Sequence, residues 1–215
     1  MPKTVVTTVT TLAAVRDLTT LATVKDTLSI AGTADDAFLS RAISQCSAAI
    51  EQACNRVFAL ETVQDTVFPG RVSALQLSRW PVVSVISVTE DGEALIAGTG
   101  FTTDAAVGRL IRMDTDGTPR PWRAIQVAVT YQAGYVLPGD VSGAARTLPF
   151  DIEDATLRLV VARYAERRRD PFIKSEEVAG VGRIDYIVGN PAAGDGNLPP
   201  DVADIVRNYR VPVIG

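Results

Sequence analysis

Acidic side chains come nearest to a catalytic pattern in this chain, because facing carboxylates can act as general acid and base. Asp35 and Asp36 are adjacent, and Asp91 precedes a glycine. A hydrolase would need two carboxylates that face each other and have different pKa values, and the sequence shows no such pair. Asp35 and Asp36 stand where a helix is predicted to begin, a position that favours negative charge. We therefore predict a structural role for them.

Histidine is absent from the 215 residues, and only two cysteines are present. Without histidine, the Ser-His-Asp and Cys-His catalytic machinery and the imidazole metal sites are excluded. Cys46 and Cys54 are eight residues apart in a predicted helix. That spacing is about 12 Å, too far for a disulfide between them. Both lie on the apolar side of the helix, so we predict buried free thiols. The sequence predicts no enzyme, no metal and no cofactor.

Composition excludes several further classes of protein. Apolar residues make up 47% of the chain and charged residues 21%, which indicates a globular protein with a core. The net charge of −4 gives no reason to expect DNA binding through a basic surface. No apolar run is long enough to span a membrane, and the N-terminus lacks the apolar stretch of a signal peptide. We expect a soluble, intracellular protein without a membrane partner.

Helices are predicted at both ends of the chain. Residues 18–29 and 36–57 have apolar residues at spacings of three and four, which indicates one buried helical face. Acidic residues follow a proline at residues 149–154 and again at 199–201, as is typical of helix starts. We therefore predict helices over 151–169 and 200–207.

A β-rich region separates these helices. Residues 83–89 alternate around β-branched side chains, and Asp91-Gly92 is a hairpin turn signal. Further strands are predicted at 94–96, 109–113 and 124–131. Trp80 and Trp122 flank the strands, where we expect them to anchor a core. The predicted fold class is therefore α+β, a bundle of about four helices with an inserted small antiparallel β-unit and an extended C-terminal segment.

The helix at 151–169 is apolar on more than one face, so something must cover it on two sides. A neighbouring subunit is a natural cover for the second face. The three arginines that close this helix, Arg167, Arg168 and Arg169, have two interpretations. They complement the negative end of the helix, or they pair with acids such as Glu176 and Glu177 in a salt-bridge cluster that faces another subunit or another protein. Residues 175–197 form a long segment of little predicted structure, which is typical of chain ordered by a partner. Within it, 181–188 has β-character and could pair with a sheet edge elsewhere.

Several short motifs, in the order in which they occur along the chain, resemble those of the head–tail connector, or adaptor, proteins of tailed bacteriophages. The resemblance is to the long form with a β-insert, as in siphophage-type prophages and gene transfer agents. It covers residues 18 to 212 and no single motif is decisive. The motifs are LATVKDTL at 21–28, DDAFL at 35–39, AAIE at 48–51, NRVF at 55–58, LSRWPVVSV at 77–85, VTYQAGY at 129–135, and the two segments that begin with LP at 148 and 198. The chain departs from the family in its loop at 141–147 and its Thr-rich N-terminus.

The resemblance implies a structural virion protein in the neck, made in the host cytoplasm. Such adaptors form dodecameric rings that dock under the portal protein, receive a stopper or tail-terminator protein, and let double-stranded DNA pass without sequence-specific binding. The implied domains are a flexible arm at 1–16, a helical core at 17–58 and 148–172, an inserted β-domain at 59–140, and a portal-docking segment at 173–215. The implied portal-binding residues are Ile184, Tyr186, Ile187, Val188, Val206, Tyr209 and Arg210. The predicted inter-subunit residues are Leu157, Val161, Tyr164, Arg167, Arg168 and Arg169.

Two alternatives remain open at this point. One is a tail terminator or stopper, which also forms a ring but usually a hexameric one. The other is a non-viral binding module, or a hydrolase that uses Asp35, Asp36 or Asp91.

Overall fold

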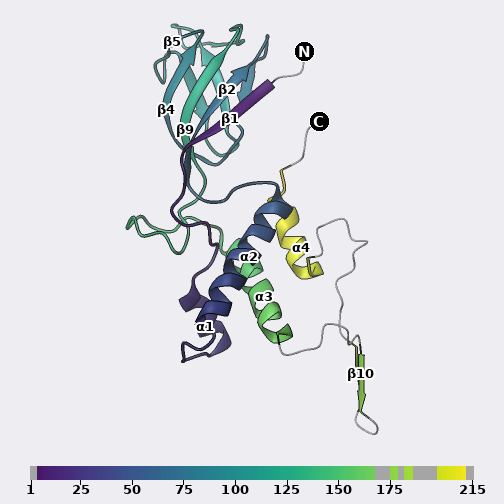
Figure 1. Cartoon of the computed structure of the whole chain (residues 1–215). Helices are drawn as coiled ribbons and strands as arrows, with labels where there is room; N and C mark the ends of the chain where they lie inside the picture. Colours follow the sequence, from purple (N-terminus) through teal and green to yellow (C-terminus); the bar gives the residue numbers. More distant parts are fainter. Residues whose placement is uncertain (1–3, 168–174, 179–181, 186–197, 212–215) are drawn as a thin grey trace. The chain divides into compact units, whose positions relative to one another are not determined.

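The computed structural model describes residues 4–167, 175–178, 182–185 and 198–211, in which four helices and antiparallel sheets alternate along the chain (Figure 1). The chain forms two compact units. The β-unit comprises Met1–Val15 and Val57–Val136, and the helical unit comprises Arg16–Arg56 and Leu137–Gly215. The predicted α+β class is confirmed. The sheets are as prominent as the helices, so a helical bundle alone does not describe the fold.

The larger sheet of the β-unit has five strands in the order β1-β2-β9-β4-β5, and all neighbouring strands are antiparallel. In β2 and β9, buried residues alternate with partly exposed ones, as expected when one face covers a core. The strands are β1 (Thr4–Thr11), β2 (Glu61–Phe68), β9 (Val127–Ala133), β4 (Val82–Glu90) and β5 (Glu93–Ala94).

The second sheet has the order β3-β7-β6, with β8 paired to β7. These strands are β3 (Ala74–Gln76), β7 (Arg109–Met113), β6 (Phe101–Asp104) and β8 (Pro119–Arg120). One hydrophobic cluster joins residues of both sheets, and fully buried Trp122 lies in it. Trp122 therefore anchors the core as predicted, while Trp80 is half-buried.

The prediction of a flexible arm at residues 1–16 is wrong for residues 4–11, which form strand β1 along the edge of β2. Val5 and Val9 pack against the core cluster, and the Thr7 hydroxyl donates to the Asp65 carboxylate at 2.7 Å. The stretch consists of threonine and valine alone. These β-branched residues favour strands, and their inward-facing valines bind the strand to the unit.

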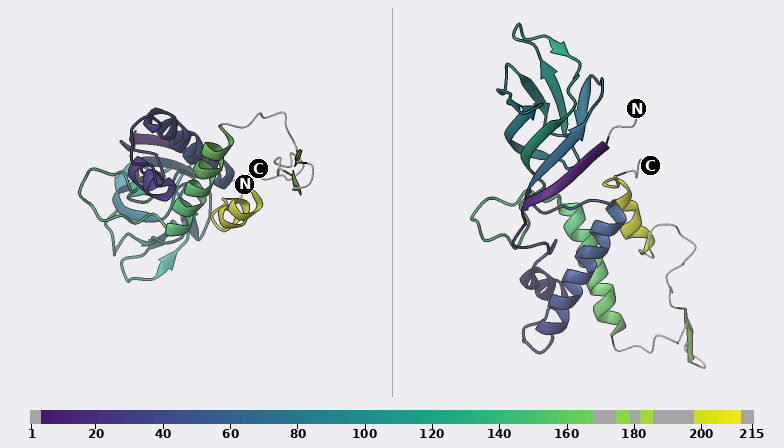
Figure 2. Two further views of the ribbon diagram at one scale, coloured as in Figure 1. Left: turned by 90° about the horizontal axis from the view of Figure 1, so that it is seen from below. Right: turned by 45° about the horizontal axis from the view of Figure 1, so that its top comes forward.

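The helical unit is built from α1 (Leu21–Leu28), α2 (Asp36–Cys54), α3 (Phe150–Glu166) and α4 (Pro200–Arg207). Helix α3 runs beside α2, and α4 packs against both (Figure 2). The apolar residues of α1, α2 and α3 share one core cluster that contains Cys46. Both cysteines are buried and free, which confirms that prediction. Among the described helices, none is long and apolar enough to cross a membrane.

Side chains satisfy several of the polar groups that this packing buries. The Thr20 hydroxyl accepts a hydrogen bond from the Thr23 amide and so caps α1. Glu153, which is 7% exposed, accepts from the Thr19 hydroxyl at 3.1 Å and pairs with Arg146 at 2.5 Å. A buried carboxylate is tolerated when it is paired in this way.

Strands β10 (Ser175–Val178) and β11 (Gly182–Asp185) form a separate two-stranded antiparallel sheet. The β-character predicted for residues 181–188 is therefore present at 182–185. The partner of β11 is the preceding strand and not a sheet edge elsewhere in the chain. Local pairing closes a much shorter loop and so loses less conformational entropy.

Candidate interaction surfaces

Helix α4 is held to the rest of the helical unit by its apolar side. Val202 is fully buried and Val206 is 4% exposed. Beyond the helix, the Val211 amide donates to the Cys54 carbonyl at 2.9 Å, so the chain stays attached to the end of α2. Burying a valine side chain stabilises by roughly 1.5–3 kcal/mol. The two valines therefore contribute about 3–6 kcal/mol to the docking of α4.

Polar contacts surround this apolar patch. Arg158 on α3 pairs with Asp154 at 2.8 Å and reaches Asp201 on α4 at 3.0 Å. The Tyr209 hydroxyl lies 2.8 Å from both carboxylate oxygens of Asp151. Hydrogen bonds to Asp201 and then to Asp154 raise the pKa of Arg158, and the hydrogen bond from Arg158 lowers the pKa of Asp201. These hydrogen bonds and ion pairs are exposed to solvent, so each contributes little to stability but orients α4.

The structure places the predicted portal-binding residues in different settings. Val206 is buried against the helical unit, so a partner could reach its side chain only after α4 leaves its site. Tyr209 is half-buried and bonded to Asp151, and Arg210 is exposed. Ile184 belongs to β11, whose side chains are not described, and Tyr186, Ile187 and Val188 lie outside the described residues.

A compact polar cluster occupies the C-terminal end of α3. Asp35, just before α2, accepts hydrogen bonds from the Tyr164 hydroxyl at 2.7 Å and from Arg167 at 2.5 Å. The Arg167 guanidinium also lies 4.4 Å from the Tyr164 ring centroid and 5.6 Å from that of Phe38, within cation–π range. The hydrogen bond to Asp35 raises the pKa of Arg167. The cluster fastens the end of α3 to the start of α2.

Two predicted inter-subunit residues, Tyr164 and Arg167, therefore have partners within the chain. Leu157 is partly buried against the core of the helical unit, and Val161 is half-buried on α3. Arg168 and Arg169 lie outside the described residues. The structure gives Arg167 an ion pair with Asp35, and the side chains of Glu176 and Glu177 lie outside the described part of the chain.

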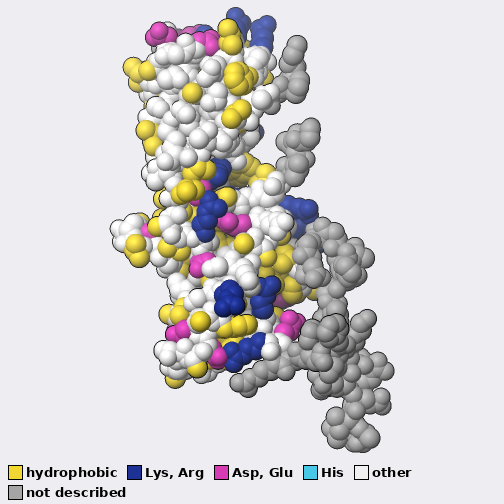
Figure 3. Space-filling view, viewed as in Figure 1, with side chains coloured by type: hydrophobic (Ala, Val, Ile, Leu, Met, Phe, Trp, Pro, Cys, Tyr) yellow, Lys and Arg dark blue, Asp and Glu magenta, His cyan; other side chains and the backbone are white. Residues whose placement is uncertain are grey.

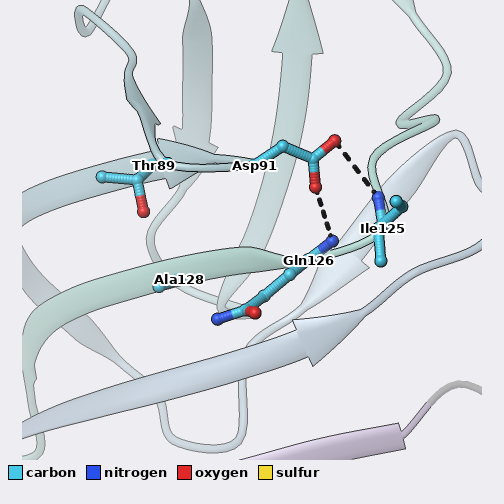
Figure 4. A pocket seen from close by; sticks show the side chains of 6 residues that line it. Thr89, Asp91, Ile125, Gln126 and Ala128 are labelled. Carbon is cyan, nitrogen blue, oxygen red and sulfur yellow. Dashed lines mark hydrogen bonds between the residues drawn. The ribbon is translucent and has the colours of Figure 1, made fainter.

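The carboxylates considered for catalysis have structural partners. Asp36 pairs with Lys25 at 2.8 Å. Asp91 borders a surface hollow of the β-unit, and its carboxylate accepts from the amides of Gln126 at 2.8 Å and Ile125 at 3.3 Å (Figure 4). These bonds fix the turn after β4. Within the described part of the chain, no group of three or more Cys, Asp or Glu side chains is placed to hold a metal ion.

Sequence reasoning missed the buried polar network around Asp65. This carboxylate is fully buried. It accepts two hydrogen bonds from Ser78, one from the Ser78 amide at 2.7 Å and one from the Ser78 hydroxyl at 2.8 Å. It also accepts from the hydroxyls of Thr7, at 2.7 Å, and Tyr131, at 2.8 Å. Burial, with the charge of Asp65, raises the pKa of Tyr131 far above its usual range. The available signal was an acidic residue at an inward position of the alternating β2 pattern.

Comparison with known proteins gives one family and one fold. A family model described as head completion protein matches residues 17–211, which span both units. The chain is also similar to a solved chain from the neck of an empty gene transfer agent particle, computed with C6 symmetry. The two are 20% identical, the match covers 98% of each chain, and the TM-score is 0.56, which establishes a shared fold. No curated protein matches the chain.

Proposed function

Since the chain belongs to the head completion protein family, we propose that it forms a ring under the portal protein that joins the DNA-filled capsid to the tail. The family is a structural one, and its members are head–tail connector proteins of the virion. The observation that carries the proposal is the family match over residues 17–211, because it includes the helical unit and the β-unit together.

The ring that we propose is a dodecamer. A contact between two different surfaces of identical subunits closes into a ring when the rotation between subunits divides a full turn. The similar neck structure was computed with C6 symmetry, and a ring of twelve subunits contains that symmetry. In our proposal the helical segments 17–58 and 148–172 form the wall of the ring, and 59–140 forms an inserted β-domain.

Helix α3 is proposed to carry the subunit contact. Leu157 and Val161 are partly buried within one chain, so part of each apolar side chain stays available to a neighbour. Arg168 and Arg169 follow Arg167 in the sequence and would add charged contacts. Tyr164 and Arg167 contribute through the Asp35 cluster, which holds the end of α3 in place.

The C-terminal segment is proposed to dock on the portal protein. Ile184, Tyr186, Ile187, Val188, Tyr209 and Arg210 would supply apolar and cationic contacts, and Val206 would join them if α4 undocks. The opposite side of the ring would receive the stopper or tail-terminator protein. Double-stranded DNA would pass through the lumen without sequence-specific binding, in keeping with the net charge of −4.

Native mass spectrometry and cryo-EM of the protein mixed with its portal protein test this proposal. We expect a ring of twelve subunits seated under the portal. Val161→Glu should prevent the ring, since it puts a charge into the apolar contact, whereas Ser44→Glu, at an exposed position of α2, should leave it intact. A hexamer bound away from the portal would indicate a terminator or stopper instead. Absence of binding between the protein and the portal protein would refute the adaptor role.

A further inference from the structure

Strand β1 leaves one edge of the five-stranded sheet open. Among the described strands it is hydrogen-bonded to β2 alone, and none of the backbone hydrogen bonds outside the sheet involves Thr4–Thr11. Its eight residues are all threonine or valine. Natural sheets protect such edges with charged residues, proline, bulges or covering segments, because an unpaired edge recruits another strand. Residues 4–9 of β1 have none of these protections, and the irregularity in the β1–β2 pairing comes only after Val9.

The opposite edge of the same sheet is protected. Strand β4 has two register irregularities, at Val82/Ser84 and at Val85/Ser87, which distort the edge that a new strand would need. Strand β5 covers its end at Thr89 and Glu90. The Val88 carbonyl in β4 also accepts a hydrogen bond from the Leu95 amide, so this carbonyl already has a partner. The sheet can therefore be extended regularly at β1 only.

The two faces of β1 differ, which restricts how a new strand can pair. Val5, Thr7 and Val9 lie opposite the buried β2 residues Val67, Asp65 and Val63, so they face inward. Val6, which is 53% exposed, and Thr8 face outward. The surface around β1 and β9 has few charged side chains (Figure 3). A one-residue slip would exchange the two faces, so only registers that keep inward residues opposite inward residues are allowed.

We propose that β1 of the free protein pairs antiparallel with β1 of a second copy, in a register centred on Thr7. In this register Val5 lies opposite the partner's Val9 on the inner face, and Val6 lies opposite the partner's Thr8 on the outer face. Thr7 lies opposite the partner's Thr7. Each dimer then contains two apolar Val5–Val9 pairs that continue the two cores, and cross-strand pairs of this kind stabilise sheets.

Two further properties select a second copy as the occupant. The strand is uncharged, so two copies approach without repulsion, and its pattern is self-complementary about Thr7. A register centred on Thr8 also keeps inward-facing residues opposite inward-facing residues, but it places Val5 opposite the partner's Thr11. That register runs into the irregularity between Val9 and Thr11 and loses the valine pair. Because the contact is isologous and the β4 edge is protected, association stops at a dimer.

Disulfide trapping tests the register directly. In an oxidised mixture of V6C and T8C proteins, we expect a covalent dimer that contains one copy of each. A mixture of T66C and T8C is the matched control, because Thr66 is opposite Val6 on the same sheet but one strand further in. T7C alone should also trap, since Thr7 meets its own copy. Both native cysteines are buried, so background linkage should be low. Equal trapping in the control mixture would contradict the register.

The strength of the contact is tested by a charge at the edge. We expect V6K to raise the dimer dissociation constant by about tenfold, because two symmetry-related cross-strand pairs are lost. T66K, which adds the same charge on β2, should change it little. Sedimentation of the wild-type protein without portal should show a dimer. A wild-type monomer, or a dimer that V6K leaves unchanged, would overturn the proposal without affecting the portal-bound ring, which is measured separately.

Discussion

The buried carboxylate of Asp65 should be the main polar determinant of the stability of the β-unit. It receives four hydrogen bonds from three residues, Thr7, Ser78 and Tyr131. These residues come from β1, the segment after β3, and β9, so one side chain connects distant parts of the unit. All four hydrogen bonds are donated to Asp65, which suits an ionised carboxylate because this group can only accept hydrogen bonds.

Replacing Asp65 by leucine or by asparagine removes the same charge but leaves different hydrogen bonds. With leucine, the Ser78 amide loses its acceptor. The hydroxyls of Ser78 and Tyr131 are 3.2 Å apart and can hydrogen-bond to each other, so one of these two hydroxyls also loses its acceptor. Each unsatisfied buried donor costs about 1–3 kcal/mol. Subtracting the relief of a buried charge, we expect Asp65→Leu to lower the free energy of unfolding by about 3 kcal/mol.

Asparagine should be tolerated far better. Its oxygen can accept from the Ser78 amide and the Tyr131 hydroxyl, while its amide group donates to the hydroxyls of Thr7 and Ser78, which rotate to accept. We expect a loss of about 1 kcal/mol or less for Asp65→Asn, the size of one ordinary hydrogen bond. The difference between the two variants then measures the hydrogen bonds and not the charge.

Urea unfolding followed by tryptophan fluorescence is the suitable assay. The only tryptophans, Trp80 and Trp122, are both in the β-unit, so fluorescence reports on that unit alone. With a typical urea dependence of about 2 kcal/mol per molar, Asp65→Leu should lower the midpoint by about 1.5 M. Equal shifts for the two variants would show that the charge matters and the hydrogen bonds do not, and our reasoning would then be refuted.

Further predictions concern the backbone, the docking of α4 and the thiols. Gly134→Ala should destabilise the β-unit by about 3 kcal/mol or more, because its Cβ would lie 2.3 Å from the Ala59 carbonyl oxygen at a φ of +115°. Gly92→Ala, at a φ of +91° with open space around it, should cost about 1–2 kcal/mol by the same fluorescence assay. In hydrogen exchange of the α4 amides, Val206→Ala should weaken docking by about 2 kcal/mol. Arg158→Gln should weaken it much less, because the ion pairs of Arg158 are exposed to solvent. The pKa of Asp201 is lowered in the folded protein. Its carboxylate should therefore stabilise the docking of α4 above the unfolded pKa of about 4, and this stabilisation should be lost as the pH falls through the folded pKa. The α4 amides should accordingly exchange faster at pH 3 than at pH 6, after correction for intrinsic exchange rates. Burial raises the pKa of Cys54 to about 11, so a thiol reagent at pH 8 should label it in the native protein far more slowly than in urea, and equal rates would contradict its burial.

The helices could be predicted from the sequence because each has its own periodic apolar face and start signals. The structure places α3 at Phe150–Glu166 and α4 at Pro200–Arg207, close to the predicted 151–169 and 200–207. Strand β1 was missed because its Thr/Val pattern reads as a polar linker until β2 supplies a neighbour. The pairing of β1 with β2 joins residues more than fifty positions apart, and no local pattern encodes such a contact.

The candidate site residues show the same limit. The sequence identified Tyr164 and Arg167 as chemically distinctive, but it could not show that Asp35, about 130 positions earlier, binds both of them. Asp35 itself was interpreted from its place at a helix start, which is correct but incomplete. Polar partners depend on how helices pack, and packing is set by the whole core.

The docking of α4 has an energetic consequence for any partner that uses Val206. Val202 and Val206 together gain about 3–6 kcal/mol from burial, and the contacts of Arg158 and Tyr209 add to it. A portal protein that engages Val206 must supply more binding energy than this, because a ligand shifts an equilibrium only by its difference in affinity for the two states. A portal protein that leaves α4 docked has no such cost, but it can reach only the exposed side of the segment, where Arg210 lies. Val202→Ala separates the two cases, because Val202 is buried and holds α4 in place but is not one of the proposed portal contacts. It should strengthen portal binding when undocking is required, because the docked state is weakened, and leave portal binding unchanged when α4 stays in place.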